Sequence, residues 1–197
     1  MTICILVAGS CSCASRPSIV PKNRIDVERV ARVIEDLFDK AQRDIEAYAA
    51  EYCAATGRAA VLLLPLDNRS RATLDSTNTA LLEGRVEGAL VNMRFEHEEG
   101  MSGKVCELTE IRRVRAIMQK AGIGLAPEKL FLPDARTRFL EAARGGGLDP
   151  DLFAYCRFLD PSSQEAGSRI LQIELKIVRM VDGRILVSHF GNTQGGA

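Results

Sequence analysis

Apolar residues recur at intervals of three and four positions between Val30 and Tyr52. Such spacing places one apolar stripe along a helix, so it predicts a long helix that begins after Asp26, a suitable N-cap. Gly57 lies beyond the last apolar position and is typical of a helix stop. The stripe consists of Val30, Val33, Ile34, Leu37, Phe38, Ala41, Ile45, Tyr48 and Tyr52.

Three shorter segments also have helical spacing. Asp75 and Asp134 each precede one of them as a predicted N-cap. The third covers 107–121 and ends at Gly122. Their predicted inward-facing residues are Leu81, Leu82, Val86, Ala89, Leu90 and Met93, then Phe139, Leu140 and Ala143, and in the third segment Ile111, Val114, Ile117 and Met118.

A continuous apolar run from Ala59 to Leu66 has the length of a strand, which predicts a strand covered on both faces. Pro65 near its end indicates a sheet edge or a strand terminus. The other predicted strands are a short one over 94–97 and three in the last third, over 151–159, 169–180 and 183–190.

The strand over 169–180 alternates, with Leu171, Ile173, Leu175, Ile177 and Arg179 against Gln172, Glu174, Lys176 and Val178. Asp182-Gly183 after it is typical of a two-residue hairpin. The order of elements predicts an α/β (α+β) fold with a single mixed β-sheet, a C-terminal antiparallel meander and flanking helices. At 197 residues the chain suits one domain.

Composition excludes some classes of partner. Lys plus Arg equals Asp plus Glu at 26 each, so no net field steers the chain onto nucleic acid. There is no tryptophan and only 5% of residues are aromatic, so stacking platforms for single strands are scarce. No apolar run approaches the about 20 residues of a membrane-spanning helix. We expect no nucleic-acid partner.

Candidate catalytic and metal-binding residues are few. Glu96-His97-Glu98-Glu99 is predicted to be a solvated acidic loop, because neighbouring side chains of a strand point to opposite faces. The glycine-rich stretches 122–124 and 145–147 lack the spacing of a phosphate loop. His189 has no accompanying nucleophile motif. We therefore expect no enzyme, no metal and no cofactor, with a small hydrolase using His97 or His189 as the enzymatic alternative.

The cysteines in the body of the chain are widely spaced. Cys53, Cys106 and Cys156 form no C-x-x-C pair and have no histidine at zinc-ligand spacing. We expect buried free thiols. If the protein is exported, one disulfide among these three residues and Cys13 becomes possible.

The first residues resemble a bacterial lipoprotein signal. Val7-Ala8-Gly9-Ser10-Cys11 has small residues before a cysteine, like a lipobox, so Cys11 is the predicted site of lipid attachment, with Cys13 as a weaker second. Residues 1–25 would then be a signal remnant and a short tether. No Lys or Arg precedes Arg16, so a true start upstream is one alternative, and an N-terminus without a signal is another.

A polar loop is predicted over Asp67–Arg71, directly after the buried strand. Asn68 and Ser70 can bond local backbone groups and so support the fold. Arg69 and Arg71 are predicted to protrude and to be available to a partner. Asn68, Arg69, Ser70 and Arg71 are thus a candidate partner-contact or structural loop.

With these residues in view, A60-V-L-L-L-P-L-D-N-R-S70 followed by the capped helix over 75–92 resembles the LpoB family of penicillin-binding-protein activators. The likeness continues more loosely over 151–157 and 182–188. That family is related to CsgG lipoproteins and to the N-terminal domain of TolB. The resemblance implies a TolB N-terminal-like domain over 26–191, followed by a disordered tail, 192–197.

In function, the resemblance implies a non-enzymatic lipoprotein, anchored to a membrane through lipid on Cys11, with its domain in the periplasm. It would bind and regulate an envelope protein, with a penicillin-binding protein of peptidoglycan synthesis as the candidate partner. Two alternatives stay open. The chain could be a structural subunit of an envelope assembly related to CsgG-like lipoproteins, or a cytosolic domain of unknown role if the leader is not a signal.

Overall fold

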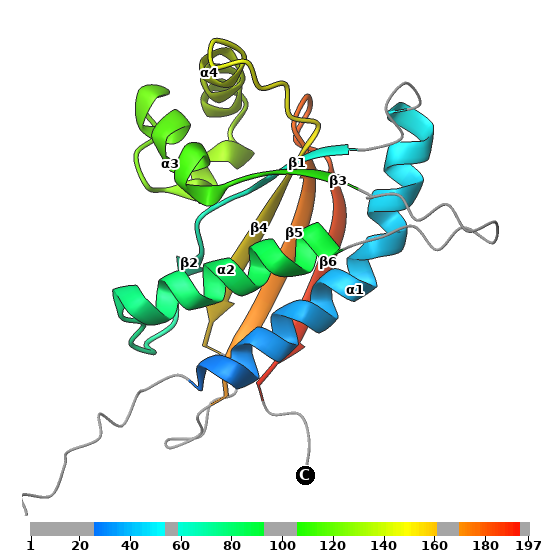
Figure 1. The fold of residues 1–197 in the computed structure, drawn as a ribbon. Coiled ribbons are helices and arrows are strands. Elements are labelled where there is room, and N and C mark those ends of the chain that lie inside the picture. Colours follow the sequence, from blue (N-terminus) through cyan, green and yellow to red (C-terminus); the bar gives the residue numbers. More distant parts are fainter. Residues whose placement is uncertain (1–25, 54–58, 93–105, 161–169, 194–197) are drawn as a thin grey trace, which may run out of the picture.

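The computed structural model describes residues 26–53, 59–92, 106–160 and 170–193. Its helices and strands follow one another in nearly the predicted order (Figure 1). They are α1 (Val27–Tyr52), β1 (Ala59–Leu63), β2 (Asp67–Asn68), α2 (Ser76–Asn92), β3 (Cys106–Thr109), α3 (Ile111–Lys120), the 3₁₀ helix η1 (Pro127–Phe131), α4 (Pro133–Arg144), β4 (Leu152–Leu159), β5 (Gln172–Arg179) and β6 (Ile185–Asn192).

The long N-terminal helix begins where it was predicted to begin. The Asp26 carboxylate accepts a hydrogen bond from the Arg29 amide, and the apolar stripe is covered as far as Tyr48. Tyr52 was wrongly assigned to the covered stripe: it is 53% exposed, because it stacks outward on Tyr48 beneath the Arg179 guanidinium. Gly57, the predicted stop, lies outside the described residues.

The second helix confirms its predicted cap, since Asp75 accepts a bond of 2.7 Å from the Asn78 amide. Leu81 is 46% exposed and does not face the core, whereas Leu82, Val86 and Leu90 are buried. None of the helices in the described ranges combines the length and the apolar character that spanning a membrane would require.

The six strands of the described ranges lie in one mixed sheet, with the order β3-β1-β4-β5-β6 and β2 paired with β4. The pairs that join β1, β2, β3 and β4 are parallel, and β4, β5 and β6 form an antiparallel meander. The predicted fold class is therefore confirmed. Pro65 marks a strand terminus and not an edge, because β1 ends at Leu63 and lies between two other strands.

Three local predictions were wrong. Residues 106–109 form β3 where the helix over 107–121 was expected to start, because pairing with β1 outweighs their local pattern. The helix at 133–144 is preceded by Leu132 as N-cap, and Asp134 lies in its first turn after Pro133. The connection between β5 and β6 is longer than two residues, and Gly183 takes a φ of +75° in it. The short strand predicted over 94–97 lies outside the described residues.

Helices cover the two faces of the sheet unequally. On the first face, α1 and α2 enclose a large apolar core with residues such as Phe38, Phe158 and Ile173. On the second face, α3, η1 and α4 enclose a smaller core that includes Phe139, Phe153 and Val178 and lies toward one end of the sheet (Figure 1). The described helices leave the rest of this second face, around Arg157 and Glu174, without an apolar cover.

Candidate functional site

The candidate loop begins as a strand and not as a free loop. Asp67 and Asn68 form β2, which pairs in parallel with Arg157 and Phe158 of β4, and the Arg69 amide donates to the Phe158 carbonyl at 2.9 Å. Two residues are too few to show strand periodicity, so this pairing had no signal in the sequence. The pairing fixes the direction in which the following residues leave the sheet.

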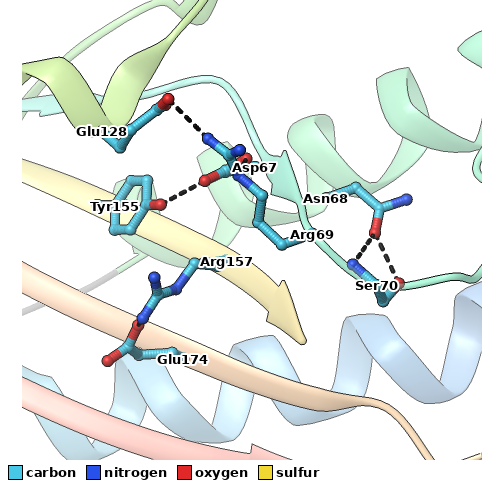
Figure 2. A network of polar contacts seen from close by, with 8 residues as sticks. All are labelled: Asp67, Asn68, Arg69, Ser70, Glu128, Tyr155, Arg157 and Glu174. Atoms are coloured by element: carbon cyan, nitrogen blue, oxygen red, sulfur yellow. Dashed lines mark hydrogen bonds and ion pairs between the residues drawn. The ribbon is translucent and has the colours of Figure 1, made fainter. Parts of the chain in front are cut away.

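Asn68 and Ser70 bond to each other and to the backbone in the turn after β2. The Asn68 side-chain oxygen accepts bonds from the Ser70 amide at 3.1 Å and the Ser70 hydroxyl at 2.7 Å (Figure 2). The Asn68 amide group donates to the Ala72 carbonyl at 2.9 Å. Arg71 is held by its backbone, whose amide donates to Asp160, and its side chain is 91% exposed. Arg71 therefore extends further into solvent than Arg69, whose side chain is 50% exposed.

Arg69 turns back onto the protein and joins two carboxylates. Its Nε lies 2.7 Å from Asp67 Oδ1 and its Nη2 lies 2.6 Å from Glu128 Oε1 on η1 (Figure 2). The Tyr155 hydroxyl donates to the other Asp67 oxygen. Burial raises the pKa of Tyr155 above its usual range, and the hydrogen bond to Asp67 raises it further. The Asp67 and Glu128 carboxylates raise the pKa of Arg69, so both groups keep their protons at neutral pH.

Strand register extends this cluster into a row across the sheet. Asp67 pairs with Arg157, Arg157 with Glu174, and Glu174 with Phe190, so four strands each contribute one residue. Residues that pair in register present their side chains on the same face. From β2 to β6 the row therefore consists of an acidic, a basic, an acidic and an aromatic side chain.

Glu174 lies at the centre of the row. Its carboxylate accepts a bond from Arg157 and lies 2.7 Å from Lys176 Nζ, and its side chain is 3% exposed. Lys176 and Arg157 are more exposed than Glu174 and cover its carboxylate from either side. Figure 2 shows Arg157 beside Glu174. Phe190 ends the row on β6 and is 53% exposed. We call Asp67, Arg69, Tyr155, Arg157, Glu174, Lys176 and Phe190 the polar row.

The aromatic ring of Phe131 separates the polar row from the small apolar core. Its centroid lies 5.5 Å from Phe153 and 5.2 Å from Tyr155, and Lys176 Nζ lies 5.8 Å from the ring. Two enclosed polar atoms beside the row, Glu128 Oε2 and Arg157 Nε, have no hydrogen-bond partner in the described structure. Such atoms are each unfavourable by about 1–3 kcal/mol, so they mark the row as incompletely satisfied.

Most residues of this cluster were not predicted from the sequence. Glu128, Tyr155, Arg157, Glu174 and Lys176 were not candidates. The signal that could have found part of it is the spacing of two between Tyr155 and Arg157 and between Glu174 and Lys176, which places polar groups on one face of consecutive strands.

Among the other candidates, Cys156 agrees with the prediction of a buried free thiol. Cys53 is also buried, and its thiol donates to the Asp151 carboxylate at 3.7 Å. Burial raises the pKa of Cys53 to about 11 and that of Cys156 to about 12, so both are protonated and poorly nucleophilic at neutral pH. Only the backbone of Cys106 is described, in β3.

The remaining candidates in the described ranges are the glycine-rich stretches and His189. Gly122 and Gly124 both have a φ of +69° and make the turn after α3, as predicted. His189 lies on β6, and its Nε2 is enclosed without a partner. The described part of the chain brings together no group of three or more metal-ligating side chains. Cys11, Cys13 and 96–99 lie outside the described residues.

Comparisons with known proteins give structural matches only. No family model and no curated protein sequence matches the chain. The C-terminal domain of LpoB from Salmonella enterica matches with a TM-score of 0.48 and 16% identity, covering 87% of this chain and all of that one. The solution structure of Escherichia coli LpoB matches with a TM-score of 0.49 and 13% identity, covering 98% of this chain and 80% of that one.

A lipoprotein from Neisseria meningitidis also matches, with a TM-score of 0.45 and 14% identity over 68% of this chain and 81% of that one. The solved structures to which this chain is similar thus include LpoB domains and a further lipoprotein, all at low identity.

Proposed function

We propose that the chain is a non-enzymatic lipoprotein of the cell envelope that binds and regulates an envelope protein through the polar row. The observation that carries the proposal is the arrangement of the polar row on the second face of the sheet. It sets ion-paired side chains beside the exposed ring of Phe190, where the described helices provide no apolar cover.

The ion pairs make this surface suitable for recognition. Long charged side chains lose rotamer freedom when a partner immobilises them, which opposes binding. Here Arg69, Arg157 and Lys176 are already held by carboxylates, so part of that ordering is complete before binding. Arginine and aromatic residues are also enriched at the centres of protein interfaces. Glu128 Oε2 and Arg157 Nε could gain partners through small side-chain rotations.

Regulation would follow from preferential binding. A protein that binds the active conformation of its partner more tightly than the inactive one shifts the population toward activity without chemistry of its own. A penicillin-binding protein is our candidate partner, on the basis of the sequence resemblance. The domain would extend beyond the predicted boundary at 191, because β6 includes Asn192 and the Thr193 amide donates to the Leu171 carbonyl.

The proposed anchor limits where the partner can lie. If lipid is attached to Cys11, the 15 residues of 12–26 join the anchor to α1. At no more than about 3.6 Å per residue they span at most about 54 Å. The partner would therefore present its binding surface close to the membrane, on the periplasmic side.

Metabolic labelling with palmitate tests the anchor. We expect cells that express the chain from DNA including its upstream region to label the protein, and Cys11→Ala to abolish the label. A Cys13→Ala variant serves as the matched control and should keep it. Equal absence of label from all three, with the protein in the cytosol, would overturn the envelope assignment.

Binding to a purified penicillin-binding protein from the same cells tests the partner. Arg71→Glu and Phe190→Ser alter exposed side chains of the candidate loop and the polar row, so the fold should survive. We expect each to weaken binding at least about tenfold, whereas the distant exposed substitution Gln119→Lys should have no effect. Binding that is absent in the parent chain, or unchanged in both variants, would contradict the proposal.

A further inference from the structure

The two edges of the sheet differ in length and protection. The edge strand β3 has four residues, and short edge strands offer little to a pairing chain. The other edge, β6, has eight residues and pairs only with β5 among the described strands. From Ile185 to Asn192 it contains no Asp, Glu, Lys, Arg or Pro, the residues that usually prevent edge pairing.

The hydrogen-bonding pattern shows which backbone groups of β6 point away from the sheet. The Thr193 amide donates to the Leu171 carbonyl at 2.9 Å, which makes this a hydrogen-bonded pair. Because such pairs alternate in antiparallel strands, His189 and Gly191 also bond toward β5. The backbone groups of Ser188, Phe190 and Asn192 consequently point outward, and all three residues are exposed.

A register shift near Ile177 and Val178 limits this open segment at its other end. Beyond the irregularity, β6 runs regularly from Val187 to Asn192. At about 3.4 Å per residue, these six residues offer about 20 Å of strand, which is a usual length for strand pairing.

We propose that β6 pairs in antiparallel orientation with β6 of a second copy of this chain, forming a two-fold symmetric dimer with a continuous sheet. An uncharged strand meets no like-charge repulsion when it meets itself. In a two-fold antiparallel pair, residues with outward backbone groups lie opposite one another. Ser188 and Phe190 would then lie near the axis, and the Phe190 ring would stay on the second face of the sheet beside its cross-strand neighbour from the other copy.

The same observations favour a second copy over a foreign segment. Peptides that add a strand to an edge are selected by side-chain pockets or charges next to the main-chain bonds. The exposed positions 188, 190 and 192 carry a hydroxyl, a phenyl ring and an amide, without a charge to select a different sequence. A strand of the same neutral character satisfies them. A two-fold pair is also closed, so it does not extend into a ring or filament.

Analytical ultracentrifugation of the full chain over a range of concentrations tests the dimer. The chain would carry Cys11→Ala so that lipid does not contribute to association. We expect a monomer–dimer equilibrium, and we expect Ser188→Lys to raise its dissociation constant by at least about tenfold, because two ammonium groups meet near the axis. Ser188→Thr and Gln119→Lys are the matched controls and should keep the parent value.

Hydrogen exchange provides a second measurement on the same sample. The outward amides of Ser188 and Phe190 should exchange more slowly as the protein concentration rises, and this change should be absent from Ser188→Lys. Circular dichroism would confirm that this exposed substitution leaves the fold intact. A monomer at every concentration, or a dimer that Ser188→Lys does not weaken, would overturn the proposal.

The dimer does not rest on the proposed function. If binding to the envelope partner fails while the mass still depends on concentration, the partner proposal alone is wrong. If the chain is monomeric but binds the partner, the edge proposal alone is wrong.

Discussion

The two faces of the sheet are covered by different kinds of side chain. On the first face, residues such as Phe158 and Ile173 are fully covered by α1 and α2. On the second face, Arg157 and Glu174 occupy the adjacent positions of the same two strands, and within the described ranges ion pairs with each other and with Lys176 cover Glu174. Alternation along one strand thus separates a core residue from a surface residue. The first face stabilises the fold, and the part of the second face around Arg157 and Glu174 is where we propose that a partner binds.

Truncation of the packed face should have the largest effect. Phe158→Ala removes a ring that is 0% exposed and leaves a cavity between β4 and the two covering helices. We expect the free energy of unfolding to fall by about 3–5 kcal/mol, as measured by urea denaturation. Phe190→Ala, which truncates the same side chain on the exposed end of the polar row, is the matched control. An equal loss from both would contradict the contrast between the faces.

Disruption of the polar row should have a smaller effect with a distinct signature. Glu174→Leu leaves Arg157 and Lys176 without their shared carboxylate, so we expect a loss of about 1–3 kcal/mol. Adding Arg157→Leu and Lys176→Met removes the unpaired charges and should restore much of the loss. Denaturation of the single and triple variants tests this coupling, and additive losses would show that the ion pairs act independently.

Periodicity predicted the helices and strands whose pattern lies within one segment. It missed the contacts that join two segments. The helix from Asp26, the buried strand after Ala59 and the C-terminal meander all have local patterns, and each formed. The bond between Tyr155 and Asp67 joins residues 88 positions apart, and it exists because β2 pairs with β4 in one register. Burial of Glu174 likewise depends on neighbours from another strand. Nothing in a single segment predicts either arrangement.

The turn between β5 and β6 lies against Arg136 of α4, on the covered part of the second face. Gly183 in this turn permits the close approach. Gly183 has a φ of +75°, and a Cβ there would clash with the guanidinium group of Arg136. Arg136 is buried on α4 and donates to the Leu130 and Phe131 carbonyls. We expect Gly183→Ala to lower stability by about 1–2 kcal/mol. Gly84→Ala, at a helical position with open space around it, should be neutral or stabilising in the same thermal melts.

Alkaline titration of Cys156 reports on both faces at once. Burial in the packed core, and to a smaller extent the charge of Glu174 on the opposite face, together raise the pKa of this thiol from its ordinary value of 9.0 to about 12. Because the folded state holds the proton more tightly, the associated stability is fully present below pH 9 and is lost as pH rises toward 12. The loss approaches about 1.4 kcal/mol per pH unit in that window.

Urea denaturation at pH 8, 9 and 10 measures this loss. Cys156→Ala should lower the free energy of unfolding at pH 8, because it leaves a small cavity. Above pH 9 the free energy of unfolding of this variant should fall less steeply with pH, because the titration of one thiol is absent. Glu174→Gln should move the thiolate absorbance transition of Cys156 slightly toward lower pH, because the raising charge is gone while the side-chain volume is kept. A transition that does not move would show that the packed face alone sets the thiol pKa, and that the polar row acts only on its own side of the sheet.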